Sequence, residues 1–348
     1  MNNKEIILNS IVGKGRGSGT RLPVSLLSGG TWTFKQKDFS LLDVLKQPQI
    51  ASESIVEMSQ IIQSDIVWPG SGYHNLLVHV FGGEVKFRHF GNIDVLRPLF
   101  HRIADLDQLH LEQLDQHEWI ANLRWIIGDV ADKSGEQYLV GTSSWGPFTL
   151  AGQFYGVEKL MTGVYKDKQG IHALMDLMTE ICFRYLAPAI DKGAAILSIA
   201  EPTASGDLIS LRHFEEFIAP YLAKVIRKLK EHKALIALHI CGNIKDRIHL
   251  APELGVDLLS VDYKVDLPLA QKALNGKIAL AGNVNPVILK DKSPEEVEIA
   301  VIESLQHVNT DRFVVMPGCD IPPGVPLANV QAFIAAGSKY KRMMKTCQ

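Results

Sequence analysis

Two short segments of this 348-residue chain contain residue types that bind metals. The first, residues 238–243, reads LHICGN and places His239 and Cys241 one residue apart at the end of an apolar run. The second, residues 316–320, reads MPGCD and supplies Cys319. Side chains two apart on a strand point to the same face, so we expect His239 and Cys241 to face one side together. Zinc prefers cysteine and histidine ligands, and three protein ligands with an open fourth position are typical of catalytic zinc.

An ordinary core role competes with this metal hypothesis. An isolated His-x-Cys pair is weak evidence, because both residues also occur as satisfied core residues. A further cysteine at another predicted strand end strengthens the hypothesis. Glu201, in the segment EPTAS, would fill the fourth metal position reversibly or act as a base, unless it is only a structural hydrogen-bond partner. Cys182, in a helical pattern, and Cys347, near the C-terminus, are predicted to lie outside the site.

Alternating short and long apolar patterns predict the scaffold that must position these residues. Eight short apolar runs, which end at glycine, proline or polar residues, are typical of buried parallel strands. They cover residues 23–28, 65–68, 137–141, 195–200, 235–239, 258–261, 277–281 and 312–316. Helical patterns lie between them, so we predict an α/β chain folded as a single (β/α)8 barrel domain over residues 1–348. An insertion at about 75–136 would separate the second and third strands, and a doubly wound sheet is the competing architecture.

Polar and aromatic residues gather at the predicted carboxyl ends of these strands, where the chemistry of such barrels takes place. We expect them to line a binding site for a small substrate. They are Trp32, Trp68, Tyr73, His74, Trp145, Asp262 and Asn283. For the aromatic residues among them, packing in the core or at the rim competes with binding of a flat ligand such as an aryl methyl ether.

The composition argues against several classes of protein. A net charge of −2 provides no basic field for nucleic acid. Four cysteines are too few for a disulfide framework and favour a reducing, cytoplasmic setting. The first residues lack the pattern of a signal peptide, and no apolar run reaches the length of about 18 residues that a membrane span needs.

Three segments resemble a known family. HICGN at 239–243, EPTASGDLIS at 201–210 and GCDIPPGVPLANVQAF at 318–333 are similar to the zinc-dependent methyltransferase branch of the uroporphyrinogen decarboxylase superfamily. That branch contains methylcobalamin:coenzyme M methyltransferases and corrinoid-linked enzymes that demethylate small compounds, including aryl methyl ethers. The family fold is a single (β/α)8 barrel, which agrees with the strand pattern.

The resemblance implies a role for each metal-binding residue. His239, Cys241 and Cys319 would hold zinc, with Glu201 a candidate fourth ligand. It also implies methyl transfer between a small substrate and a corrinoid, in a direction that the sequence leaves open. The chain has no D-x-H-x-x-G signature for holding cobalamin, so we expect the corrinoid to arrive on a separate protein. The oligomeric state is also open, with a homodimer among the options.

The decarboxylase branch of the same superfamily is the alternative. Its polycarboxylate substrate needs arginines after the first strand, in a pattern like R-Q-A-G-R, whereas residues 26–36 read LLSGGTWTFKQ. The second strand end, WPGSGYHN at 68–75, offers no carboxylate to match the decarboxylase aspartate. Because a guanidinium is hard to replace in carboxylate recognition, metal-free decarboxylation is disfavoured. A non-catalytic barrel with a structural zinc is the third hypothesis.

Overall fold

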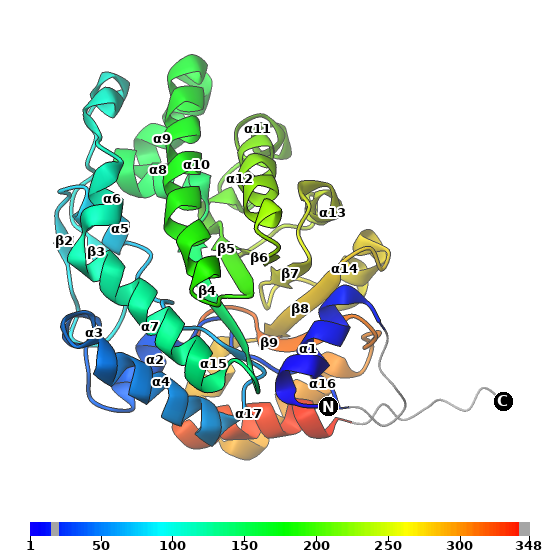
Figure 1. Ribbon diagram of the computed structural model, residues 1–348. Helices are drawn as coiled ribbons and strands as arrows, with labels where there is room; N and C mark the ends of the chain where they lie inside the picture. The colour runs from blue at the N-terminus through cyan, green and yellow to red at the C-terminus, as the bar shows by residue number, and fades with distance from the viewer. Residues whose placement is uncertain (15–20, 341–348) are drawn as a thin grey trace.

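A curled sheet of seven parallel strands lies at the centre of the computed structural model, which describes residues 1–14 and 21–340 (Figure 1). Neighbouring strands follow one another in chain order: β1 Ile66–Val67, β4 Leu139–Trp145, β5 Ile196–Ala200, β6 Leu235–Ile240, β7 Leu258–Val261, β8 Ala279–Val284 and β9 Phe313–Pro317. Almost every strand residue is buried, as expected for a parallel sheet covered on both faces. The predicted barrel fold class is confirmed.

Helices surround this sheet (Figure 1). The α-helices are α1 Asn3–Val12, α2 Gly30–Lys35, α3 Leu41–Lys46, α4 Pro48–Ile62, α5 Leu76–Val80, α6 Glu112–Gln116, α7 Glu118–Ser134, α8 Pro147–Tyr155, α9 Val157–Lys166, α10 Lys168–Asp191, α11 Leu211–Phe217, α12 Ala219–Glu231, α13 Ala251–Leu254, α14 Leu267–Leu274, α15 Pro286–Asp291, α16 Pro294–Leu305 and α17 Leu327–Lys339. Short 3-10 helices are η1 Ile103–Gln108, η2 Pro202–Ala204 and η3 Ile248–Leu250. None of the helices in the described ranges combines the length and the apolar character that a membrane crossing needs.

The long connection between β1 and β4 contains the segment that we predicted as an insertion. Two short strands, β2 Val85–Lys86 and β3 Asp94–Val95, pair antiparallel in it. Its last helix, α7, packs against α4 and β4 and so joins the helical layer around the sheet. Helix α5 precedes the hairpin, while η1 and α6 lie between the hairpin and α7.

The first predicted strand, residues 23–28, is not a regular strand, although it closes the sheet. Val24 forms a parallel bridge to Val315 of β9, and the Ser25 N–H donates to the Val315 carbonyl at 3.0 Å. On the other side, the N–H of Asp65 donates to the Val24 carbonyl at 2.9 Å, next to β1. The expectation of a full eighth strand was therefore wrong. Pro23 has no N–H to donate and α2 begins at Gly30, so only one short stretch is left to fill the eighth position.

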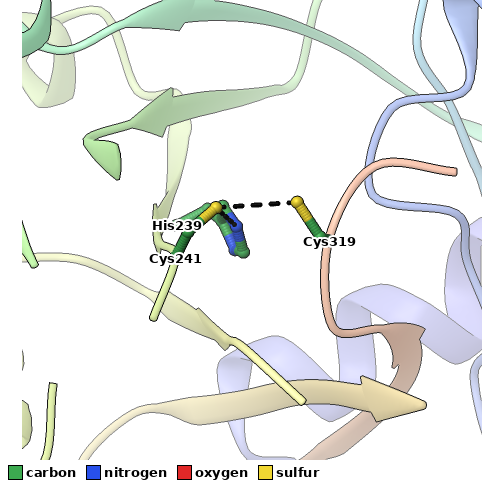
Figure 2. A group of neighbouring side chains, drawn as sticks. All are labelled: His239, Cys241 and Cys319. Atoms are coloured by element: carbon green, nitrogen blue, oxygen red, sulfur yellow. Dashed lines mark hydrogen bonds between the residues drawn. The ribbon is translucent and has the colours of Figure 1, made fainter. Parts of the chain in front are cut away.

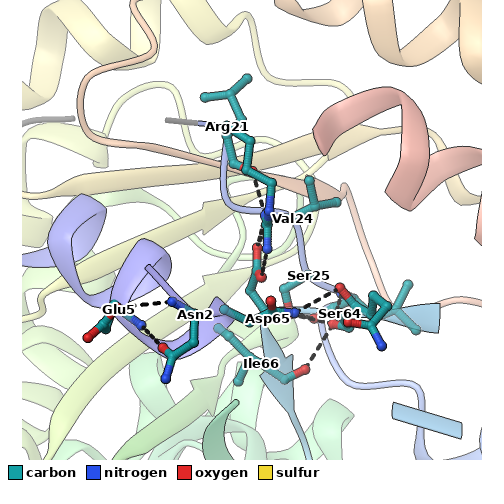
Figure 3. Close-up of polar contacts among 12 residues, drawn as sticks. Asn2, Glu5, Arg21, Val24, Ser25, Ser64, Asp65 and Ile66 are labelled. Atoms are coloured by element: carbon teal, nitrogen blue, oxygen red, sulfur yellow. Dashed lines mark hydrogen bonds and ion pairs between the residues drawn. The ribbon is translucent and has the colours of Figure 1, made fainter. Parts of the chain in front are cut away.

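The segment around Val24, where β9 and β1 meet, is the seam of the barrel. Asp65, at the amino end of β1, holds this seam through its carboxylate (Figure 3). Its side chain is completely buried and accepts hydrogen bonds from both terminal nitrogens of Arg21, one of them at 2.8 Å. The Val24 N–H donates to the same carboxylate at 2.7 Å. Burial raises the pKa of the Asp65 carboxyl, while the hydrogen bonds from Arg21 and Val24 act in the opposite direction. The seam therefore depends on a buried charge that its partners must satisfy.

The inside of the barrel is filled with apolar side chains, and α1 closes its amino end. The interior cluster consists of Ile7, Ile11, Leu27, Ile66, Trp68, Leu139, Ile196, Ala237, Leu258, Ala279, Ala281, Val314 and Met316. Helix α1 is tied to the last strand, because Ser10 Oγ donates to the Phe313 carbonyl at 3.2 Å and Arg312 donates to the Ile11 carbonyl at 2.6 Å. Since Ala237 faces the interior, strand alternation makes His239 face it too.

The seam predicts a large stability loss when Arg21 is removed. In Arg21→Met, the Asp65 carboxylate stays buried without its cation, and we expect the free energy of unfolding to fall by about 3–5 kcal/mol. Arg88→Met is the matched control, because Arg88 pairs with Asp94 on an exposed hairpin. Loss of that exposed pair should change the free energy of unfolding far less, because water and salt screen its charges. Chemical denaturation of both variants measures the difference, and equal losses would contradict this account of the seam.

Candidate metal centre

His239, Cys241 and Cys319 come together at the carboxyl end of the barrel (Figure 2). Their ligand atoms all lie within 4.8 Å of one another. His239 Nε2 is 3.0 Å from Cys241 Sγ, and Cys241 Sγ is 3.6 Å from Cys319 Sγ. Two sulfurs at about 2.3 Å from a tetrahedral zinc ion are roughly 3.8 Å apart, so the spacing of the thiols fits such an ion. The two metal-binding segments, 78 positions apart in the sequence, therefore form one group.

Ser260, on the neighbouring strand β7, holds the imidazole ring of His239. The parallel register of β6 and β7 pairs His239 with Ser260, and Ser260 Oγ lies 3.0 Å from Nδ1 of the ring. Both side chains are buried. In the tautomer that donates its Nδ1 proton to the hydroxyl, the imidazole directs the lone pair of Nε2 toward the cysteines. The histidine is thus oriented to bind a metal ion through Nε2.

Two glycines allow the loops beside the cysteines to pack closely. Gly242 follows Cys241 with φ +73°, and a Cβ atom on it would lie 2.4 Å from a carboxylate oxygen of Asp207. Gly318 precedes Cys319, and a Cβ atom there would lie 2.4 Å from the backbone nitrogen of Tyr263. Glycine is therefore required next to each cysteine, at Gly242 for the left-handed backbone and at both positions for space.

The two thiols form a coupled pair. A hydrogen bond from Cys241 lowers the pKa of Cys319 to about 4, and His239 contributes in the same direction against the effect of burial. The same hydrogen bond raises the pKa of Cys241, together with burial and the nearby charges of Asp262 and Asp320. A single negative charge is thus shared by the pair in the absence of a cation. A metal ion would supply the positive charge that both thiolates need.

Glu201 follows β5, but its carboxylate is directed at the start of α8. The side chain is completely buried and accepts hydrogen bonds from the N–H groups of Phe148 and Thr149 and from Thr149 Oγ1, at 2.9, 2.8 and 2.7 Å. Burial raises the pKa of this carboxyl to about 7, although these hydrogen bonds oppose the shift. The structure does not bring Glu201 into the group of ligand atoms around Cys241.

Of the predicted substrate-binding residues, His74 and Trp145 form a pair near the ends of β1 and β4. Their ring centroids are 4.4 Å apart, His74 Nε2 lies 2.7 Å from Ser143 Oγ, and Trp145 Nε1 donates to Asn75 at 2.7 Å. Burial lowers the pKa of His74 to about 4, so its imidazole is uncharged at neutral pH. The two rings are tilted by 41° to each other, and the pair carries no charge at neutral pH.

Asp262 and Asn283 lie next to the metal-binding group and are linked to each other. The Asp262 carboxylate accepts from the N–H of Gly242, directly after Cys241, at 2.9 Å. The side-chain amide of Asn283 donates to the backbone carbonyls of Asp262 and Val265 at 3.0 and 2.6 Å. Asn283 thereby supports the loop that carries Asp262.

The remaining predicted aromatic residues are packed inside the protein. Trp32 is fully buried and donates to the Val325 carbonyl, while Trp68 lies in the barrel interior and donates to the Leu26 carbonyl. Tyr73 is also buried in the core. At these three positions the structure shows core packing, which was the alternative to ligand binding in the sequence analysis.

Sequence reasoning missed three residues that hold the metal-binding loops. They are Ser260, Asp207 and Asp320. The signal for Ser260 is its place opposite His239 on the next strand, which becomes visible only when the register is known. Cys182 is buried against the Trp145 carbonyl, outside the metal-binding group, and Cys347 lies outside the described residues.

A hollow of about 660 Å³ lies at the opposite end of the barrel. It is lined by residues that include Lys4 of α1, Gly135, Val140 at the start of β4 and Ala195 before β5. None of its lining residues belongs to the metal-binding group or to the predicted substrate-binding set. The chemistry-bearing side chains and this hollow are therefore separate features.

Known proteins resemble this chain in both sequence and fold. Residues 21–340 match the family model described as uroporphyrinogen decarboxylase (URO-D). A methylcobamide:CoM methyltransferase of Methanosarcina mazei is 28% identical over 248 residues, 71% of each chain, and a uroporphyrinogen decarboxylase of Synechococcus is 27% identical over 80% of this chain and 77% of its own. A solved methyltransferase structure from Methanosarcina mazei superposes with a TM-score of 0.86 at 22% identity, covering 97% of this chain and 98% of its own.

The contact between His239 and Ser260 predicts that removal of the Ser260 hydroxyl weakens metal binding. Ser260→Ala leaves the Nδ1 proton of His239 without its acceptor, and we expect zinc affinity to fall by about 10–100-fold while the fold is kept. Competition with a chromogenic chelator measures this affinity. Ser198→Ala is the matched control, because Ser198 is a buried serine on β5, the other neighbour of β6, and is paired there with Ala237. Equal losses in both variants would contradict the orienting role.

The raised pKa of Glu201 predicts that the free energy of unfolding depends on pH. Its pKa rises from 4.5 in an unperturbed chain to about 7 in the fold, so the folded state holds the extra proton between these values. The free energy of unfolding should therefore fall as the pH rises from about 4.5 to about 7, by an amount on the order of 3 kcal/mol. Denaturation at pH 5 and pH 7.5 measures this, and Glu201→Gln should flatten the profile. An unchanged profile in the variant would assign the pH dependence to other groups.

Proposed function

The chain belongs to the uroporphyrinogen decarboxylase (URO-D) family, and we propose that within it the protein is a zinc-dependent, corrinoid-linked methyltransferase. It would move a methyl group between a small substrate and the cobalt of a corrinoid protein. The substrate would be either a thiol acceptor or a methylated donor such as an aryl methyl ether. The relatives named methylcobamide:CoM methyltransferases support corrinoid-linked methyl transfer.

The observation that carries this proposal is the group of His239, Cys241 and Cys319. Three ligand atoms of the types that zinc prefers lie within 4.8 Å of one another, at the carboxyl end of the barrel. Zinc bound there would act as a Lewis acid on the sulfur or oxygen of the substrate. We propose that these three residues hold the ion and leave its fourth position to the substrate.

The residues of the chain would position the substrate. Ser260 keeps the His239 ring in place, and the uncharged pair of His74 and Trp145 would pack against the substrate. In the thiol direction, the sulfur would lose one proton to solvent and supply the electron pair for the new carbon–sulfur bond, while the pair of the broken carbon–cobalt bond would stay on the cobalt. In the demethylation direction, the cobalt supplies the pair and the heteroatom of the substrate keeps that of its former bond to the methyl carbon.

Glu201 enters the proposal as a positioning group. A carboxylate that reached the metal would have to give up the hydrogen bonds from Phe148 and Thr149. We therefore place Glu201 as the residue that holds the start of α8, directly after Trp145. As a buried carboxyl with its pKa near 7, it remains a candidate base only if α8 moves.

The decarboxylase relative supports one alternative, metal-free decarboxylation of a porphyrinogen-like tetrapyrrole. That substrate carries many carboxylates and needs free guanidinium groups. The arginine before the first strand, Arg21, is committed to Asp65 at the other end of the barrel. Residues 26–36 contain no arginine. The methyltransferase proposal is therefore the better supported of the two.

The proposal is tested first by the zinc content of the purified protein. We expect one zinc per chain in the wild type and less than about a tenth of that in Cys241→Ser and Cys319→Ser, since each removes one of three ligands. Cys182→Ala and Glu201→Gln are the controls, and both should keep the wild-type zinc content. Elemental analysis under reducing conditions measures it.

Methyl transfer is then assayed with methylcobalamin and a thiol, and with cobalt(I) cobalamin and an aryl methyl ether. Activity should require zinc and should be lost together with it in the cysteine variants. A wild-type protein that binds no zinc after reconstitution would overturn the methyltransferase proposal. Zinc binding without exchangeable ligands would indicate the structural role instead.

A further inference from the structure

We propose that the site selects a methyl donor or acceptor that carries no anionic group, and this inference rests on the proposed function. The relevant part of the molecule is the set of loops that follow the strands, which we call the mouth. It comprises residues 28–31, 68–75, 145–149, 201–210, 241–247, 262–266, 283–285 and 318–326. The argument concerns the charges and the free hydrogen-bond donors of these loops.

Carboxylates of the chain already use the backbone N–H groups beside the metal-binding residues. Asp262 accepts from Gly242 and from Lys264, each at 2.9 Å. Asp207 accepts from the N–H of Asn243 at 3.0 Å. Such N–H groups are the usual way in which a loop binds an anion, and here each has a carboxylate as its acceptor.

The same arrangement recurs at the two other loops near the site. Asp320, next to Cys319, accepts from the N–H of Gly29 at 3.0 Å. Glu201 accepts from the N–H groups at the start of α8, where an anionic ligand would otherwise be favoured. Carboxylates of the chain thus stand where a phosphate, sulfonate or carboxylate of a substrate would have to bind.

The lysines and arginines of the mouth either form hydrogen bonds within the protein or are exposed to solvent. Arg247 is the only lysine or arginine that is buried among the residues the structure describes. Its guanidinium donates to the carbonyls of Ala204 and Ile209, at 2.7 and 2.9 Å, and to Asp246. Lys245 and Lys264 are exposed, so water and salt screen their charges.

His74 does not supply the missing positive charge either. Burial lowers the pKa of its imidazole to about 4, so the ring is neutral at physiological pH. Among the described residues of the mouth, no buried cation is free to meet an incoming substrate, and two thiolates would offset the charge of a bound metal ion. A substrate that binds this ion through sulfur or oxygen would therefore place any anionic tail among Asp207, Asp262 and Asp320. A methyl ether, a methyl thioether or a neutral thiol avoids this repulsion.

The test compares thiols of equal length and different charge on the cobalt(II)-substituted protein. The probes are 2-mercaptoethanol, which is neutral, 2-mercaptoethanesulfonate, which is an anion, and 2-(methylsulfonyl)ethanethiol, a neutral compound close to the sulfonate in size. The change in the cobalt(II) absorption spectrum on thiol binding gives each Kd, without any activity assay. We expect both neutral thiols to bind roughly tenfold more tightly than the sulfonate at low salt, and the difference to shrink at 0.5 M salt as charges are screened.

Charge variants identify the groups responsible. Asp262→Asn should reduce the discrimination against the sulfonate several-fold, and Asp207→Asn should reduce it less, because Asp207 is exposed. In each variant the zinc content confirms that the site is intact. Asp176→Asn removes an exposed charge that pairs with Lys224 on the helical layer, and should leave the discrimination unchanged.

The outcomes separate this inference from the proposed function. If none of the thiols alters the cobalt spectrum, the open metal position and the proposed function both fail. If the sulfonate binds as tightly as the neutral thiols or more tightly, the inference is overturned while the proposed function stands. If in addition Lys264→Gln abolishes tight sulfonate binding, that rim lysine is the anion site. Weak binding of both the sulfonate and the sulfone would assign the discrimination to size and would also overturn the inference.

Discussion

Closure of the sheet is the constraint on which the site depends. Cys241 follows the strand β6 near the middle of the sheet, whereas Cys319 follows its last strand, β9. Their sulfurs meet because the sheet curls until β9 and β1 share the short segment around Val24. That segment is held by the Asp65 carboxylate, which Arg21 satisfies at the far end of the barrel. A partly buried ion pair at one end therefore supports a group of metal-binding side chains at the other.

The elements that determine the site were predictable where local pattern and burial agree. The apolar run before His239 becomes β6 and the run before Gly318 becomes β9, because a parallel strand covered on both faces must be apolar almost throughout. Strand alternation alone predicted that the side chains of His239 and Cys241 face the same side. Cys319 could be joined to them only through the barrel hypothesis, because nothing local in its segment indicates a partner 78 residues earlier.

What could not be predicted depends on register and on competition for hydrogen bonds. Ser260 is an ordinary strand serine until the alignment of β6 with β7 places it beside the imidazole. For Glu201 the sequence left open a metal ligand, a base and a structural hydrogen-bond partner, and the carboxylate accepts from the N–H groups at the start of α8. For Trp32 and Trp68 the sequence left open core packing and ligand binding, and their indole N–H groups donate to the backbone carbonyls of Val325 and Leu26. These outcomes are set by tertiary contacts that no single segment encodes.

The tie between helix α1 and the last strand has a consequence for biosynthesis. Ser10 and Ile11 bond to residues about 300 positions later, and Ile7 and Ile11 share a core with Val314 and Met316. Helix α1 also contacts β1 and β4, which are made much earlier, but its contacts with β9 cannot form until that strand has left the ribosome. Until then the part of this core that Val314 and Met316 supply is missing. Completion of the barrel is therefore a late event, because the bonds that join α1 to the last strand can form only after nearly all of the described chain has been made.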